Sequence, residues 1–129
     1  MEIRRKATKP SPEAAIWSLA YVDVAAKEGK RILDETQYAH ALQQIEELAR
    51  ADDPRRPATL DVKSIERFFE LRDKGGVLGR INLRVYFAVL DDSHTIIVLG
   101  CYKKEDEGQL PTRIKVRIRN RLRFILENI

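Results

Sequence analysis

Positively charged side chains are concentrated towards the end of this chain. A lysine pair, Lys103 and Lys104, ends an apolar run, and residues 113–123 then contain six arginines and lysines and no acid. Cations at this density suit a polyanionic partner, because each can bind or neutralise a phosphate group. The pattern therefore indicates an RNA-binding surface, and a solvated charged helix is the alternative interpretation.

The net charge of the chain comes entirely from its second part. The 129 residues include 24 basic and 20 acidic side chains, which gives a net charge of +4. Residues 1–76 carry 14 of each sign, whereas residues 77–129 carry 10 basic and 6 acidic side chains. This asymmetry is typical of a local binding face rather than of a uniformly basic protein.

The remaining composition argues against a membrane span, a disulfide and a zinc site. No apolar run reaches the roughly 20 residues that a bilayer requires, and the basic start of the chain does not resemble a signal peptide. Cys101 cannot form an internal disulfide alone, and with His40 and His94 it supplies too few zinc ligands. Its place in an apolar run favours a small packing residue over a nucleophile. We expect a cytoplasmic protein without metal or cofactor.

The length suits one compact domain over residues 1–129. Residues 52–57 hold two prolines and four charges, which predicts a loop between elements. Before this loop, apolar residues recur with the 3.6-residue period and predict a helix over 35–50. The residues of that stripe are Tyr38, Ala41, Leu42, Ile45, Leu48 and Ala49.

The region before residue 30 admits two interpretations. Ser11, Pro12 and Glu13 make a good helix start, because they offer a cap, a first-turn proline and an acid near the positive end of the helix dipole. We therefore expect a helix over 12–27 that ends at Gly29. Residues 16–22 fit the beginning of a strand equally well.

Beyond the loop the apolar pattern changes to a period of two. Residues 82–90 predict a strand in which apolar side chains occupy one face. That face holds Leu83, Val85, Phe87 and Val89, and the other holds Arg84, Tyr86 and Ala88. We expect Arg84, Tyr86 and also Arg72 to lie on faces away from the core.

Two further strands accompany this one. Residues 91–94 are polar and predict a turn, and residues 95–102 predict a second strand. Residues 68–72 end at a glycine turn and read as a third strand, although a short helix over 63–71 competes with it. Three consecutive strands predict an antiparallel meander with an apolar face that helices must cover.

The basic tail fits two periodicities. Its apolar residues alternate with cations, as in a strand, and they also form a helical stripe of Ile114, Ile118, Leu122 and Ile125. The length of residues 112–127 exceeds that of a usual strand and favours a helix. In that helix, cations spaced by four residues would share one face.

Four motifs in this order resemble the RelE/HigB/ParE superfamily of small bacterial toxins, closest to its HigB-like, phage-derived branch. They are residues 69–72, residues 83–87, residues 97–100 running into Tyr102, Lys103 and Lys104, and residues 109–111 opening a last helix. The resemblance covers residues 60–127 and treats residues 1–51 as a helical region. It implies an α+β fold in which N-terminal helices and a C-terminal helix pack a small antiparallel sheet.

The resemblance also implies a function. RelE and HigB members are metal-independent endoribonucleases that cut mRNA, commonly on the ribosome, as toxins of type II toxin-antitoxin modules. Such a protein would have a cognate helix-turn-helix antitoxin as its partner. ParE members inhibit DNA gyrase on the same scaffold, so a toxin without enzymatic activity is the first alternative. An inactive basic nucleic-acid-binding module is the second, and the sequence does not determine the oligomeric state.

By resemblance, Arg84 and Lys103 or Lys104 are the expected catalytic cations. Because alternate strand residues point to opposite faces, only one of the two lysines is expected in the site, and the sequence leaves open which one. The expected RNA-binding residues are Arg72, Tyr86, Tyr102, Arg113 and Arg117.

The proton carrier is not identified by the sequence. Several family nucleases use a histidine or tyrosine near the C-terminus, and this chain has neither after Tyr102. A lysine with a lowered pKa, Glu105 or His94 at the tip of the predicted hairpin would have to take this role.

Overall fold

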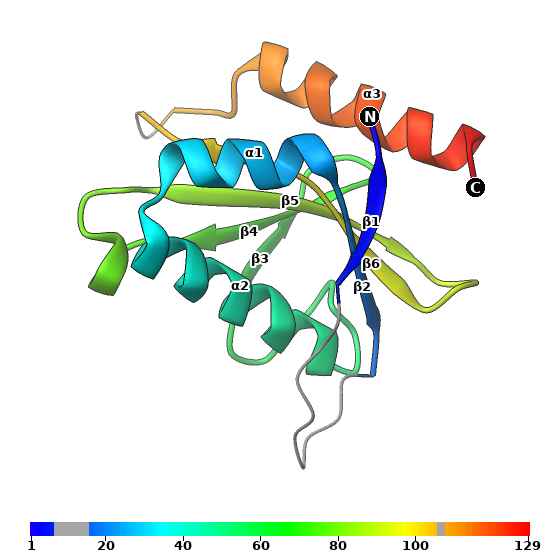
Figure 1. Ribbon diagram of the computed structural model, residues 1–129, viewed down its shortest axis with the longest axis horizontal. Coiled ribbons are helices and arrows are strands. Elements are labelled where there is room, and N and C mark those ends of the chain that lie inside the picture. Colours follow the sequence, from blue (N-terminus) through cyan, green and yellow to red (C-terminus); the bar gives the residue numbers. More distant parts are fainter. Residues whose placement is uncertain (7–15, 106–107) are drawn as a thin grey trace.

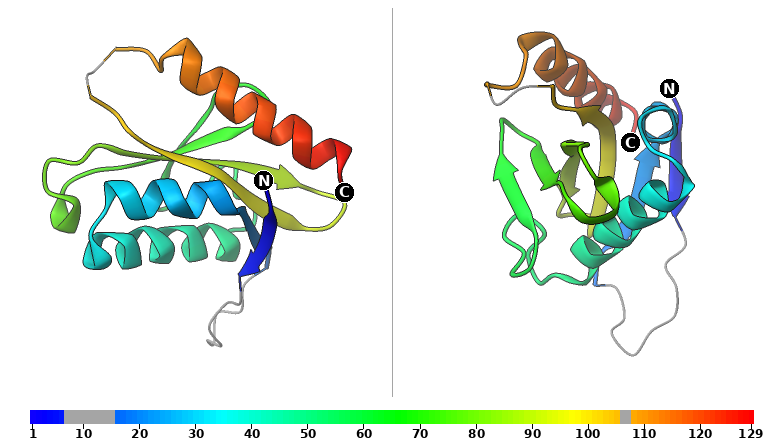
Figure 2. Two further views of the ribbon diagram at one scale, coloured as in Figure 1. Left: turned by 45° about the horizontal axis from the view of Figure 1, so that its top comes forward. Right: turned by 90° about the vertical axis from the view of Figure 1, so that its left-hand side faces the viewer.

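The computed structural model describes residues 1–6, 16–105 and 108–129, which form one mixed sheet with helices on both of its faces (Figures 1 and 2). In these described parts the sheet has six strands in the order β1-β2-β6-β5-β4-β3. The strands are β1 (Ile3–Lys6), β2 (Ser18–Val22), β3 (Asp61–Ser64), β4 (Phe69–Asp73), β5 (Leu83–Leu90) and β6 (Thr95–Lys103). The helices are α1 (Asp23–Ile32), α2 (Glu35–Arg50), the short 3-10 helix η1 (Gly76–Leu78) and α3 (Thr112–Glu127).

The predicted α+β architecture is confirmed, and the sheet is larger than expected. Strands β4, β5 and β6 form the antiparallel meander, and β3 adds to it antiparallel to β4. On the other side, β2 runs parallel to β6 and pairs with β1. A parallel pair requires a crossover connection, and α1 and α2 lie within the connection from β2 to β6. These two helices cover one face of the sheet and α3 covers part of the other (Figure 2).

The helix expected over 12–27 is wrong for residues 16–22 and correct for residues 23–27. Residues 18–22 are strand β2, so the alternative interpretation of this segment is correct, and α1 begins only at Asp23. Pairing with β6 supplies hydrogen bonds that a local cap signal cannot match, because β2 enters the buried centre of the sheet. The predicted start at residues 11–13 lies outside the described residues. With β1 and β2 present, the N-terminal region is not simply helical.

The end expected at Gly29 is also wrong, because α1 continues to Ile32. Gly29 serves packing rather than termination. A Cβ atom at this position would lie 3.0 Å from Cε2 of Tyr38, so the missing side chain lets the aromatic ring of α2 approach α1. A helix-interior glycine is tolerated where such a close contact compensates for its entropy.

Other predictions agree with the structure. Helix α2 has the expected bounds and begins with a capping box between Asp34 and Gln37. Strands β4, β5 and β6 and helix α3 lie where periodicity and length placed them. Strand β3 was missed, because it is a short edge strand, mostly exposed, that shows no apolar alternation.

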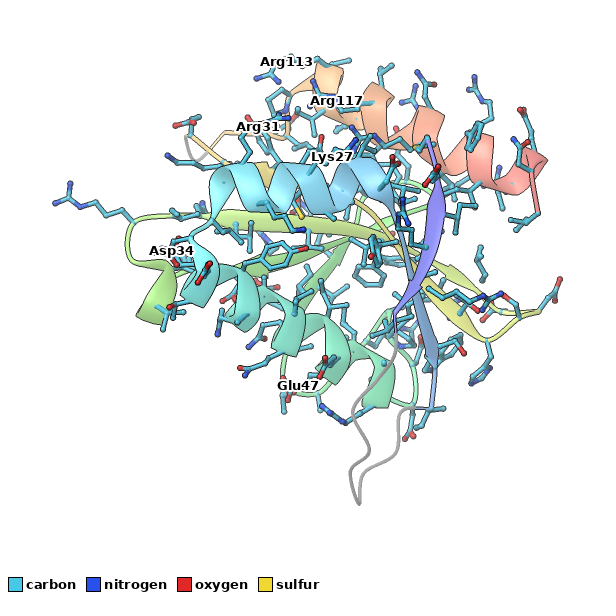
Figure 3. All side chains as sticks on the ribbon, in the orientation of Figure 1. Lys27, Arg31, Asp34, Glu47, Arg113 and Arg117 are labelled. Atoms are coloured by element: carbon cyan, nitrogen blue, oxygen red, sulfur yellow. The ribbon has the colours of Figure 1, made fainter. Side chains whose placement is uncertain are left out.

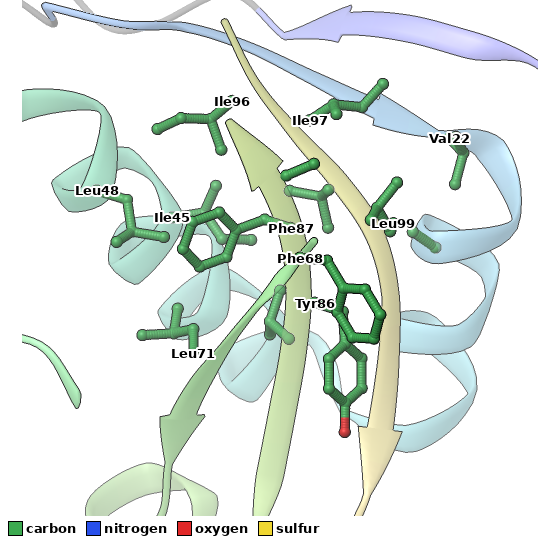
Figure 4. Close-up of a cluster of buried hydrophobic side chains, with 14 of the residues drawn as sticks. Val22, Ile45, Leu48, Phe68, Leu71, Tyr86, Phe87, Ile96, Ile97 and Leu99 are labelled. Carbon is green, nitrogen blue, oxygen red and sulfur yellow. The ribbon is translucent and has the colours of Figure 1, made fainter. Parts of the chain in front are cut away.

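Strand β5 is covered on both faces, and this coverage shapes the site described below. Its residues Leu83 to Ala88 are all buried, whichever face they point to. Phe87 packs on the side of Ile45 and Leu48 of α2, while Tyr86 packs with Phe68 (Figure 4). The expectation that Arg84 and Tyr86 lie on an exposed face is therefore wrong. A single strand pattern cannot show that a distant C-terminal helix covers its polar face.

The carboxylate of Glu28 ties α1 to β6 and α3. Its Oε1 accepts hydrogen bonds from Nη1 of Arg121 at 2.7 Å and from the backbone N of Cys101 at 3.2 Å, and its Oε2 accepts one from Nη2 of Arg121 at 2.9 Å. Nη1 of Arg121 also donates to the carbonyl of Leu99 at 2.9 Å. These charge-assisted bonds are largely shielded from water, which makes them stronger than surface pairs.

Glu28→Ala is expected to lower the free energy of unfolding by about 2–3 kcal/mol, because it leaves the largely buried Arg121 guanidinium without its counter-charge. The matched control is Glu66→Ala, which removes an exposed bidentate partner of Arg119 and should have a much smaller effect. Urea unfolding of both variants makes the comparison. Equal losses of stability would show that the Glu28 contact is no stronger than a surface ion pair.

Candidate functional site

Two of the expected cations and one expected aromatic residue lie in one row across three strands. In the pairing register Arg72 of β4 lies opposite Arg84 of β5, and Arg84 lies opposite Tyr102 of β6. Side chains that are directly opposite on neighbouring strands share a face and approach closely. The structure therefore brings together three residues that are separated by up to 30 positions in the sequence.

A buried carboxylate lies next to this row, and sequence reasoning missed it. Oε1 of Glu70 is 3.6 Å from Nε of Arg72 and 3.6 Å from Nε of Arg84. Its Oε2 accepts a hydrogen bond from the hydroxyl of Tyr86 at 3.0 Å. Glu70 sits directly opposite Tyr86 in the register, so strand alternation, once β4 is accepted, is the signal that could have found it.

The Arg84 guanidinium forms two hydrogen bonds through Nη1 and, among the described residues, none through Nε. Nη1 donates to Oδ1 of Asn82 at 2.6 Å and to the carbonyl of Leu83 at 3.2 Å. Nε is buried and makes no hydrogen bond within the described parts of the chain. Only 5% of Arg84 and 4% of Glu70 is exposed, so their interaction takes place in a low dielectric. Two guanidinium groups thus share one carboxylate, and the cluster keeps a net positive charge.

Tyr86 serves this cluster as a hydrogen-bond donor. Burial, and then the neighbouring Glu70 carboxylate, raise the pKa of Tyr86 far above its ordinary value, so the phenol stays protonated. Its ring has no exposed surface. In this arrangement Tyr86 orients Glu70 and offers no face on which a base could stack.

The exposed part of the site lies at the end of β6. The guanidinium of Arg113, at the start of α3, lies 5.9 Å from the centre of the half-buried Tyr102 ring. The backbone N of Lys104 donates to the carbonyl of Asn82 at 2.9 Å, which extends the pairing of β6 with β5 beyond Lys103. Strand alternation then puts Lys104 on the face of Tyr102 and Lys103 on the opposite face. The geometry favours Lys104 as the lysine of the site.

Cations of α1 extend the basic surface along α3. Arg117 lies 3.8 Å from Glu28 of α1, measured from Nη1 to Oε2, and Figure 3 shows it on the same side of the molecule as Lys27 and Arg31. Both α1 cations are exposed. Sequence reasoning missed them because residues 1–76 are neutral in total, and only the fold shows that α1 and α3 lie together.

The other candidate groups lie elsewhere or are engaged. His94 stacks on Trp17 with ring centres 3.8 Å apart, and it sits at the opposite end of the β5–β6 hairpin from Tyr102, roughly 26 Å away along an extended strand. This distance rules out the proton-carrying role considered for it. Nε2 of His40 lies 2.8 Å from Oδ2 of Asp73. Burial raises the pKa of the Cys101 thiol to about 12, as expected for a packing residue rather than a nucleophile.

Neither a metal cluster nor a membrane helix is found in the described ranges 1–6, 16–105 and 108–129. There, no three His, Cys, Asp or Glu side chains are grouped to hold an ion. No helix in the same ranges is long and apolar enough to cross a bilayer.

Comparison with known proteins shows the fold. A solved structure of the E. coli toxin RelE, a double arginine-to-alanine mutant in the free state, superimposes with a TM-score of 0.59 at 16% sequence identity. The match covers 84% of this chain and 99% of that chain. The chain has a RelE-like fold. No protein-family model matches the sequence, and no curated protein matches it either.

Burial of the site has a measurable consequence for stability. Arg84→Ala is expected to lower the free energy of unfolding by about 3 kcal/mol, because it leaves the buried Glu70 with only the more exposed Arg72 as its counter-charge. Lys103→Ala removes an exposed cation and should change it by less than about 0.5 kcal/mol. Chemical denaturation of the two variants checks this contrast. An Arg84→Ala protein as stable as Lys103→Ala would mean that the Arg84–Glu70 contact contributes nothing.

Proposed function

We propose that this protein is the toxin of a type II toxin-antitoxin module and a metal-independent endoribonuclease that cuts mRNA on the ribosome. The observation that carries the proposal is the row of Arg72, Arg84 and Tyr102 beside Glu70 on a RelE-like fold. In cleavage of RNA by its own 2′-hydroxyl, two guanidinium groups can stabilise negative charge and a carboxylate can accept a proton, while an aromatic ring can hold a base by stacking.

The protein has to supply a general base, a general acid and cations that stabilise negative charge. The 2′-oxygen attacks the adjacent phosphorus, and its proton must go to a base. The bond from phosphorus to the 5′-oxygen breaks, and an acid must supply a proton to that leaving oxygen. Between these events the phosphorane carries extra negative charge, which cations have to stabilise. The products are a 2′,3′-cyclic phosphate and a 5′-hydroxyl.

The cations have distinct places in this scheme. Arg72 and Lys104, both partly exposed beside the buried Arg84, are proposed to bind the scissile phosphate. Arg84 supports the transition-state charge from beneath, because its buried guanidinium adds positive potential in a low dielectric and shares the Glu70 carboxylate with Arg72. Tyr102, with Arg113 over its ring, offers a stacking surface for a base. Arg117 would contact a neighbouring phosphate.

Glu70 is the proposed proton acceptor and Lys104 the proposed donor. Glu70 is the carboxylate that the fold brings beside both arginines, and Tyr86 holds its second oxygen. In the free chain Glu70 is buried, so a bound phosphate has to draw Arg72 away from it before the carboxylate can meet a 2′-hydroxyl. In this scheme Glu70 and Lys104 carry out the proton transfers for which several family nucleases use a histidine or tyrosine near the C-terminus.

The basic surface also suits the partner expected of such a toxin. Arg113 and Arg117 of α3 and Lys27 and Arg31 of α1 lie on one side of the molecule (Figure 3). An acidic, amphipathic antitoxin segment that folds on binding could cover this surface and block the row beneath it.

The two lysines give a matched test of the site. Lys104→Ala is expected to lower the rate of cleavage of ribosome-bound message by about 100-fold, because it removes a cation that contacts the transition state. Lys103→Ala should stay within a few-fold of the unsubstituted protein, since its side chain points to the other face. Primer-extension mapping of the cut message measures both rates. Equal effects of the two substitutions would overturn the assignment of Lys104.

Glu70 and the absence of a metal requirement are tested together. Glu70→Gln, assayed with protein that was treated with EDTA and dialysed before addition to ribosomes, is expected to lower the rate by about 100-fold or more, because an amide cannot accept the 2′-hydroxyl proton. Glu105→Gln, which changes an exposed carboxylate near the site in sequence, is the control and should stay within a few-fold of the unsubstituted rate.

Three results would contradict this mechanism. Loss of all cleavage by the unsubstituted protein after EDTA treatment and dialysis would show a need for a bound metal beyond the Mg²⁺ that ribosomes supply, and an unchanged rate in Glu70→Gln would exclude Glu70 as the base. Toxicity without cleavage at any pH would indicate a protein target such as gyrase.

A further inference from the structure

A cavity of 340 Å³ lies on the face of the sheet that α1 and α2 cover, opposite the basic row of Arg72, Arg84 and Tyr102. Small side chains create its space, because four of the lining residues are alanines: Ala20, Ala25, Ala26 and Ala41. The other apolar lining residues are Leu19, Leu42, Ile45, Val85, Val98 and Cys101, and the polar ones are Arg5, Tyr21 and Tyr38. Its size and its mainly apolar wall are typical of a small-molecule site.

The polar groups of the cavity have unused hydrogen-bonding capacity. Within the described parts of the chain, no hydrogen bond is formed by the hydroxyl of Tyr21 or of Tyr38. Burial, followed by the proximity of Cys101 and Tyr21, raises the pKa of Tyr38, so its hydroxyl remains a donor. Arg5 is exposed and is the one cationic residue among the described residues that line the cavity. No Asp or Glu is among the lining residues.

We propose that this cavity binds a small monocarboxylate with an apolar body. Three donors with no acidic neighbour favour an anionic head group, and Arg5 can hold a carboxylate through two parallel hydrogen bonds. The alanine, leucine and isoleucine side chains of the wall can pack against a hydrocarbon chain. Removal of this chain from water stabilises the complex. An ammonium group would find no counter-charge among these residues.

The position of the cavity separates this site from the proposed ribonuclease site. Val85 and Cys101 are register partners on β5 and β6, and each is the direct neighbour of a residue in the basic row, Arg84 or Tyr102. The ligand would thus rest on the reverse face of the strands that carry the row. Binding is measured directly and does not depend on whether the protein cuts RNA.

Decanoate is the probe, with decylamine as its counterpart of opposite charge. Isothermal titration calorimetry is expected to show that one decanoate binds per chain. Decylamine is expected to bind at least about tenfold more weakly, because it cannot form the charge-assisted contact with Arg5. Arg5→Gln should weaken decanoate binding by about tenfold or more. Arg4→Gln is the matched control, because Arg4 is the neighbouring β1 residue, pairs with Glu2 and does not line the cavity.

Two further variants test the cavity itself. Ala41→Leu fills its volume and should abolish decanoate binding. Tyr38→Phe keeps the ring and removes a hydroxyl that makes no bond to the protein, so it should weaken binding while the unfolding temperature stays the same. This second variant remains informative if Ala41→Leu does not fold.

The proposal is overturned by any of three results. The first is no heat of decanoate binding to the unsubstituted protein at about 1 mM, which would leave an affinity too weak for a specific site. The second is equal affinity of the Arg5→Gln and Arg4→Gln proteins, or of decanoate and decylamine. The third is undiminished binding by Tyr38→Phe or by a folded Ala41→Leu protein.

Discussion

The close approach of α1, β6 and α3 at Gly100 is the constraint on which the rest of the structure depends. A Cβ atom there would lie 2.6 Å from Cδ1 of Ile118 and 2.8 Å from Nη1 of Arg121, so only glycine leaves room for the Glu28–Arg121 contact. This contact fixes α3 over the sheet through charge-assisted bonds as well as through its buried stripe. Because Arg113 lies in the first turn of α3, the same contact helps to place the Arg113 guanidinium 5.9 Å from the centre of the Tyr102 ring.

Because both faces of β5 are covered, the candidate site has a buried floor, made by Arg84 and Glu70, and a partly exposed rim, made by Arg72 and Lys104. Arg84 and Glu70 lose their water, and each needs the other, because an unpaired charge in the interior is costly. The arrangement keeps two guanidinium groups for one carboxylate and so stores positive potential under the surface. In the proposed function, Arg72 and Lys104 bind phosphate at this partly exposed rim.

The two faces of β5 and β6 have different chemistry, and strand alternation accounts for it. On the face of α3, Arg84 and Tyr102 belong to a charged row. One residue along each strand, Val85 and Cys101 help to line an apolar cavity under α1 and α2. A shift of the register by one residue would exchange these faces, so the β5–β6 pairing is a condition for both proposed sites.

The sequence by itself determined the elements whose periodicity is long and unbroken: α2, the β5–β6 hairpin and, with help from length and resemblance, α3. It also identified most cations of the candidate site, because the type of a residue is known before its position in the fold. Only the tertiary structure decided that residues 18–22 form a strand, because its partner is β6, more than 70 residues later. The same holds for the burial of Arg84 and Tyr86, the position of Glu70 beside two arginines and the placement of Lys104 on the face of Tyr102. Each of these depends on which strand or helix lies alongside, and a local pattern carries no information about a distant neighbour.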